Sequence, residues 1–117
     1  MAQLHHRATA QRGGLDRRDA PAGDSHSWHL YAVRVSPDAR VNRDGLVDAL
    51  FAARIGCSVH YIPLHLQPYW RDRYALQATD FPHSQQAYEA LVSLPIYSSM
   101  PDAAVQRVCD VLHATLG

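Results

Sequence analysis

Hydrophobic and polar positions follow two different periods along the chain, and together they predict strands as well as helices. Residues 27–35 are rich in aromatic and β-branched side chains and are followed by a Ser-Pro-Asp turn, which is typical of a strand. Beyond Asn42 apolar side chains recur every four residues, as at Leu46 and Leu50, which predicts a helix. The asparagine is suited to cap its start and Gly56 to end it, and we expect this helix to lie on the sheet.

The middle of the chain is interrupted by prolines. Residues 57–62 resume the strand pattern and stop at Pro63, so we expect a second strand there. Residues 64–70 include Pro68 and predict a loop or a short helical turn.

Two further helices and a short strand are predicted for the last third of the chain. A helix that opens at Pro82 should end before Pro95, and the apolar segment 94–97 is a candidate edge strand. The final helix places Pro101 at its first position. The apolar stripes of the two helices consist of Tyr88, Leu91 and Val92 in the first, and of Val105, Val108 and Leu112 in the second.

These elements predict an α+β fold, with a small sheet of about three strands covered by helices on one face. Residues 25–117 would form this single domain. Residues 1–24 are rich in arginine and glycine and carry almost no large apolar side chains, so we expect them to form a flexible tail.

The composition of the 117 residues, 47% of them hydrophobic, fits one soluble globular domain. Eleven basic residues balance eleven acidic ones, so we expect neither nucleic acid nor a membrane surface as a partner. The chain has neither a segment of ~20 apolar residues nor the apolar stretch of a secretory signal, and a cytoplasmic location is expected. All eleven basic residues are arginines, and the chain contains no lysine.

The densest group of functional side chains follows the predicted strand 57–62, where binding loops are often found. Two prolines restrict its backbone, so its polar groups would lose little entropy when a ligand binds. The alternative is that its aromatic residues are ordinary packing residues and that its histidines are bonded to backbone carbonyls. The group consists of Ser58, His60, Tyr61, His65, Gln67, Tyr69 and Trp70.

A metal site formed by Cys57, His60 and His65 is a weaker alternative, because residues three apart on a strand point to opposite faces. We therefore expect no metal. Cys57 and Cys109 lie in apolar segments and are interpreted as reduced, structural thiols. The sequence contains neither a Gly-x-Ser-x-Gly turn nor a glycine-rich phosphate loop before a helix.

Three motifs in the right order resemble the C-terminal end of the DegT/DnrJ/StrS family of nucleotide-sugar aminotransferases. Residues 26–31 (HSWHLY) resemble the strand that enters this domain, and residues 54–69 (RIGCSVHYIPLHLQPY) resemble the family's most recognisable C-terminal motif. Residues 93–97 (SLPIY), followed by Met100, are similar to its closing motif. The resemblance covers residues 24–116.

The resemblance implies the small, substrate-side domain of a fold-type-I enzyme that uses pyridoxal phosphate (PLP). Such enzymes transfer an amino group, usually from glutamate, to a keto-sugar linked to a nucleotide. The larger N-terminal domain of these enzymes carries the cofactor. Carried over by position, His60, Tyr61 and His65 face the substrate, and Gln67 is a further candidate for substrate binding.

PLP chemistry needs a lysine amine, which arginine cannot replace because it stays protonated. This chain should therefore contain no catalytic residue, bind PLP covalently at no residue, and be inactive alone. It would be a fragment or one half of a split aminotransferase, with a separate large domain that carries PLP as its partner. The alternatives are a stand-alone module that binds a nucleotide sugar or docks on a partner, and a remnant without activity. In each case we expect an exposed apolar patch near residues 63–70 and a tendency to self-associate.

Overall fold

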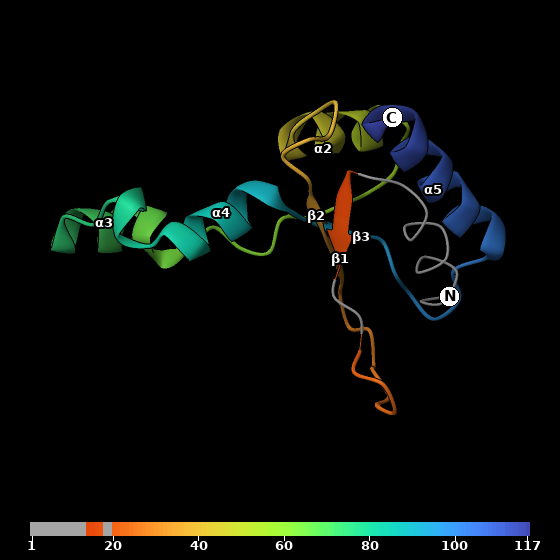
Figure 1. The fold of residues 1–117 in the computed structure, drawn as a ribbon, viewed down its shortest axis with the longest axis horizontal. Helices are drawn as coiled ribbons and strands as arrows, with labels where there is room; N and C mark the ends of the chain where they lie inside the picture. The colour runs from red at the N-terminus through yellow and green to blue at the C-terminus, as the bar shows by residue number, and fades with distance from the viewer. Residues whose placement is uncertain (1–13, 18–19) are drawn as a thin grey trace.

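The computed structural model describes residues 14–17 and 20–117. Its centre is a three-stranded antiparallel sheet in the order β1-β2-β3 (Figure 1). The strands are β1 (Leu15–Arg17), β2 (Tyr31–Val35) and β3 (Leu91–Leu94). In the middle strand, Val35 lies opposite Leu15 of β1, while Val33 lies opposite Val92 of β3.

One face of this sheet forms the core. Side chains alternate between the two faces of a strand, so Tyr31 and Val33 of β2 are buried while Ala32 between them is exposed. The helices α2 (Arg43–Ala52) and α5 (Asp102–Leu116) lie next to the sheet (Figure 1). They supply the apolar side chains that complete the core. Their buried apolar residues are Leu46 and Leu50 of α2, and Val105, Val108, Cys109, Leu112 and Leu116 of α5. The predicted α+β class, with about three strands and helices that complete the core, is confirmed.

The starts of the two core helices follow from local chemistry. The Asn42 side chain accepts a hydrogen bond of 2.9 Å from the Gly45 amide, as expected of a capping residue. Pro101 immediately precedes α5 as its N-cap, one position earlier than predicted. Since Asp102 and Asp44 each lie in the first turn of their helix, both helix dipoles are complemented.

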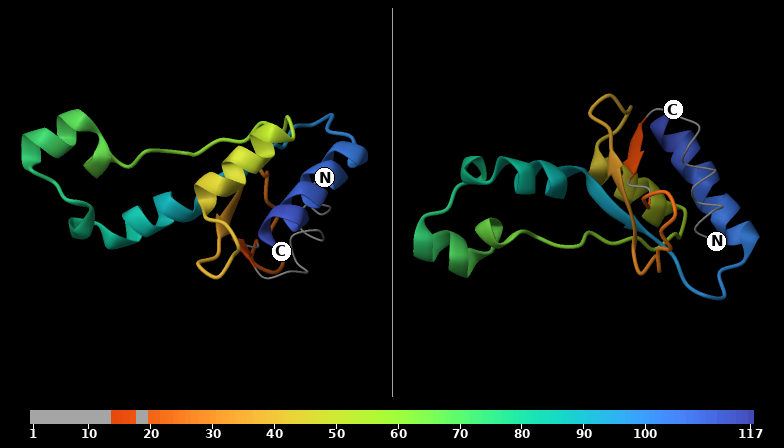
Figure 2. Two further views of the ribbon diagram at one scale, coloured as in Figure 1. Left: turned by 90° about the horizontal axis from the view of Figure 1, so that it is seen from above. Right: turned by 60° about the horizontal axis from the view of Figure 1, so that its bottom comes forward.

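The sheet and the helices α2 and α5 form the body of the molecule. Residues 59–90 extend away from this body as an elongated arm, most clearly seen in Figure 2. The arm contains the 3-10 helix η1 (Leu64–Leu66), the helix α3 (Pro68–Tyr74), the 3-10 helix η2 (Ala78–Asp80) and the helix α4 (Pro82–Ala90). The chain returns from α4 directly into β3. The loop or short helical turn predicted for 64–70 is thus η1 and the first residues of α3.

The predicted strand 57–62 is wrong. Only Ser58 pairs with β3, through hydrogen bonds with Ser93 of 3.1 Å and 2.7 Å. Beyond Ser58 the chain diverges into the arm. In the antiparallel register that pairs Ser58 with Ser93, residues 61 and 62 would lie opposite Ala90 and Glu89, which belong to α4 and not to a strand.

The predicted edge strand 94–97 is displaced to Leu91–Leu94. Proline has no amide proton for a strand ladder, and here Pro95 follows the strand instead of lying inside it. Leu91 and Val92, which were assigned to a helical stripe, instead pair with Arg34 and Val33 of β2. Pairing with the central strand therefore overrides the helical spacing.

The predicted flexible tail is wrong at Leu15–Arg17, which form β1. Leu15 is partly buried against the core, and pairing with β1 provides backbone partners along an edge of β2 that would otherwise be open. Residues 1–13 and 18–19, which also belong to the predicted tail, lie outside the described residues.

Candidate functional site

His60 lies over the face of the sheet opposite the core. Its Nδ1 atom is 3.0 Å from the hydroxyl of Ser93 in β3, and its ring meets the Tyr61 ring edge-on at 4.8 Å between centroids. His60 is half-buried, whereas Tyr61 is 77% exposed. These two predicted site residues thus sit side by side at the base of the arm, and the tyrosine is free to meet a ligand.

His65 occupies a different environment, inside the arm. It is only 4% exposed, its Nε2 lies 2.9 Å from Gln85 Oε1 of α4, and its ring stacks on Phe81 at 5.1 Å. Gln85 in turn donates from Nε2 to Glu89 Oε1 at 2.7 Å, which leaves its amide oxygen to accept from His65. His65 therefore joins the two limbs of the arm, the outgoing limb that contains η1 and the returning limb that contains α4.

Gln67 also makes a contact within the arm. Its side-chain amide donates to the carbonyl of Ile62 at 3.4 Å. Of the four predicted site residues, the structure brings His60 and Tyr61 together and directs His65 and Gln67 to other partners. Ser93 and Gln85, the partners of the histidines, were not predicted, because nothing in local spacing connects them with residues 20 to 33 positions away.

A mostly apolar cavity of about 450 Å³ lies in the arm beside His65. Pro63, Leu64, His65, Trp70, Leu76, Phe81 and Ser84 line it. Several large apolar side chains of the arm are exposed, which confirms the predicted apolar patch near residues 63–70. They are Tyr61, Ile62, Leu64, Tyr69, Trp70, Tyr74 and Phe81.

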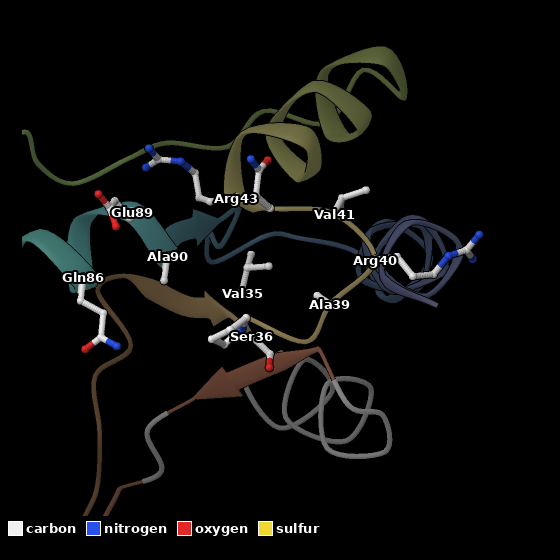
Figure 3. Close-up of a pocket in the computed structure, with 11 residues that line it drawn as sticks. Val35, Ser36, Ala39, Arg40, Val41, Arg43, Gln86, Glu89 and Ala90 are labelled. Carbon is white, nitrogen blue, oxygen red and sulfur yellow. The ribbon is translucent and has the colours of Figure 1, made fainter.

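A second hollow, of about 470 Å³, lies between the end of β2, the start of α2 and α4 (Figure 3). Sequence reasoning did not identify it. Arg40, Glu89 and Gln86 contribute polar groups to its lining. Its most buried polar residue, Arg43, is already bonded to the backbone of Tyr88 at 2.9 Å, so the guanidinium joins α2 to the end of α4.

The cysteines and histidines do not assemble a metal centre in the part of the chain that the structure describes, where no three His, Cys, Asp or Glu side chains are grouped to hold an ion. Both cysteines are free thiols. Burial raises the pKa of the Cys57 thiol, and it also raises the pKa of Cys109, with a further contribution from the charge of Asp110. Neither thiol is activated as a nucleophile, because activation requires a lowered pKa.

No helix among residues 14–17 and 20–117 has the length and apolar character needed to cross a bilayer.

Comparison with protein families gives one match that covers nearly the whole chain. The sequence model of the DegT/DnrJ/EryC1/StrS aminotransferase family matches residues 1–113. The matched range begins before residue 24, where the motif resemblance starts.

Two longer relatives are similar over 90 residues. MJ1066 of Methanocaldococcus jannaschii is 41% identical over 76% of this chain and 22% of its own length. The spore coat polysaccharide biosynthesis protein SpsC of Bacillus subtilis is 38% identical over 75% of this chain and 23% of its own length. The alignments with these curated relatives thus span less than a quarter of their lengths.

Solved structures show the same fold. The aminotransferase TlmJ of Streptoalloteichus hindustanus superposes with a TM-score of 0.80 at 25% identity, over 98% of this chain and 30% of TlmJ. The PLP form of Spr1654 from Streptococcus pneumoniae gives a TM-score of 0.83 at 21% identity, over 99% of this chain and 30% of Spr1654. The arrangement of sheet, core helices and arm is therefore one that occurs within larger proteins.

Proposed function

Because this chain belongs to the DegT/DnrJ/EryC1/StrS aminotransferase family, we propose that residues 25–117 are the C-terminal, substrate-side domain of a PLP-dependent aminotransferase that acts on nucleotide-linked keto-sugars with glutamate as amino donor. The family match over residues 1–113 carries the proposal. SpsC, named for polysaccharide biosynthesis, and Spr1654, solved in a PLP form, support a sugar substrate and PLP.

The side chains of this chain do not fit the covalent attachment of PLP. PLP enzymes attach the cofactor through the ε-amine of a lysine, and the sequence has no lysine. The guanidinium of Arg43, which is buried beside the second hollow, is occupied by the carbonyl of Tyr88. We therefore propose that residues 1–117 are inactive alone and that the cofactor and its lysine belong to the rest of the family fold.

The role left to this chain is to hold the sugar nucleotide. His60 and Tyr61 are the residues best placed to do so, because the tyrosine is exposed and the histidine is fixed beside it. An imidazole and a phenol can hydrogen-bond the hydroxyl, carbonyl and phosphate oxygens of such a ligand. His65, which is buried and bonded to Gln85, would act by shaping the arm.

Calorimetric titration with nucleotide-linked sugars tests this role. We expect heat of binding for the unaltered chain and weaker binding for His60→Ala. His65→Ala should weaken binding only as far as it disturbs the arm, which the amide spectrum of the arm would reveal. Absence of binding for every sugar nucleotide tried would contradict the proposal.

A second titration tests the absence of a covalent cofactor. Mixed with PLP alone, the purified chain should give no Schiff-base absorption that survives dialysis. A persistent band would contradict the proposal that the chain is inactive alone. It would not bear on sugar binding, which the first titration tests.

The exposed arm favours a second candidate, a stand-alone module that docks on a partner or on a second copy of itself. Leu64 is 66% exposed and Tyr69 is 68% exposed, next to an apolar cavity. Sedimentation velocity over a range of concentrations would detect self-association. We expect the double variant Leu64→Ser/Tyr69→Ser to shift the chain towards monomer, and a wild-type chain that remains monomeric at high concentration would count against self-association.

A further inference from the structure

The hydroxyl of Ser93 is buried although it does not belong to the core. Ser93 is 5% exposed and lies between Val92 and Leu94, whose side chains enter the core on the other face of β3. Its backbone amide and carbonyl are both bonded to Ser58. The hydroxyl is therefore covered by the segment that carries His60, at the base of the arm.

Within the described part of the chain, the hydroxyl of Ser93 has one hydrogen-bond partner, Nδ1 of His60 at 3.0 Å. A buried hydroxyl proton left without an acceptor costs free energy. The proton is satisfied if Oγ–H donates to Nδ1. In a neutral imidazole the other nitrogen then carries the hydrogen, so His60 is held as the Nε2–H tautomer.

We propose that Ser93 is a positioning residue that fixes the orientation and tautomer of His60, so that Nε2 offers an N–H donor to an oxygen acceptor of a ligand. Nε2 of His60 makes no hydrogen bond to any residue among 14–17 and 20–117. The ligand class, a carbonyl or phosphate oxygen of a sugar nucleotide, rests on the proposed function. The tautomer does not, because it follows from the bond to Ser93 alone.

Nitrogen NMR of the free chain tests the tautomer. With ¹⁵N-labelled histidine at about pH 8, above the ordinary histidine pKa of about 6.5, long-range proton–nitrogen correlations identify which ring nitrogen carries the hydrogen. The His60 signals are assigned by their loss in His60→Gln. We expect Nε2–H with Nδ1 as a hydrogen-bonded acceptor, and a shift of the Nδ1 signal towards that of a free imidazole in Ser93→Ala. Ser93→Thr, which keeps the hydroxyl, should restore the wild-type position.

A His60 that carries its hydrogen on Nδ1, or an Nδ1 signal unchanged by Ser93→Ala, would overturn the inference. Amide spectra verify that the sheet is intact in each variant. If Ser93→Ala unfolds the chain, Ser93→Cys provides the same comparison, because it nearly keeps the volume and replaces a strong donor by a weak one.

Titration with a UDP-linked hexose tests the role towards a ligand. Loss of one oriented hydrogen bond should weaken binding by about 2- to 10-fold in Ser93→Ala, with recovery in Ser93→Thr. Unchanged affinity in Ser93→Ala, together with a shifted Nδ1 signal, would overturn the positioning role. If no variant binds while the tautomer is as expected, the proposed function fails and the assignment of the tautomer stands.

Discussion

Arg43 offers the sharpest test of how the arm is held to the body. It lies at the start of α2, and its side chain is 9% exposed. Nη1 donates to the carbonyl of Tyr88 at 2.9 Å, near the end of α4, and the guanidinium lies 5.0 Å from the centre of the Tyr88 ring. Arg43→Met keeps much of the apolar stem and removes the charged group, so it isolates these contacts.

The expected loss follows from the individual contacts. A hydrogen bond from a charged donor contributes about 1.5–3 kcal/mol, and the contact with the aromatic ring about 0.5–2 kcal/mol. The contact with the Leu91 carbonyl, at 3.5 Å, is too long to add much. The ion pair with Asp44 also adds little, because that carboxylate is 76% exposed. Since removing a buried charge relieves its desolvation, we expect a net loss of about 2 kcal/mol.

Urea unfolding of wild type and variant measures this loss, and hydrogen exchange locates it. The amides of α4 should exchange faster in Arg43→Met, because its last turn loses the link to α2. Asp44→Asn is the matched control and should cost less than about 1 kcal/mol, from the exposed ion pair and the lost charge at the start of α2. A stability of Arg43→Met within 0.5 kcal/mol of wild type, or equal to that of Asp44→Asn, would refute this account of the junction.

Three other perturbations test the core, the arm and the thiols. Leu50→Ala, at a fully buried position, should lower the free energy of unfolding by about 2–5 kcal/mol in urea titration, and a loss below 1 kcal/mol would contradict the assigned core. His65→Ala should cost about 1–3 kcal/mol and speed amide exchange in η1, because Gln85 loses its buried partner; unchanged exchange there would argue against the link between the limbs. The folded state raises the pKa of Cys109 above its ordinary 9.0, so its contribution to stability is complete below pH 9 and is lost as the pH rises further. Wild type should therefore lose more stability than Cys109→Ala between pH 8 and 10.5, and parallel losses would exclude this contribution.

The sequence identified the features that depend on local chemistry. The helix capped by Asn42 and the helix that follows Pro101 are both present, because capping and apolar spacing act within a few residues. Strand assignments were less reliable, since a strand forms only by pairing with another segment, which its own residues do not identify. Residues 57–62 have strand composition but pair only at Ser58, and Leu15–Arg17 pair with β2 in a segment without strand composition.

The same distinction applies to the candidate site. The loop after Cys57 was identified from its residue types and its resemblance to a family motif, and the structure places His60 and Tyr61 together there. The burial of His65 was not foreseen, because its partners Phe81 and Gln85 come from the other limb of the arm. Whether these residues bind a sugar nucleotide stays a prediction.

The two hydrogen bonds between Ser58 and Ser93 bring together the place where the chain leaves the body and the place where it returns. Residues 59–90 are in this respect an insertion between two paired positions, held to the body also by the bond from Arg43 to Tyr88 and the contact of His60 with Ser93. Chimaeras that exchange this segment between family members, with His60 and Tyr88 retained, would test whether the arm determines what the scaffold binds.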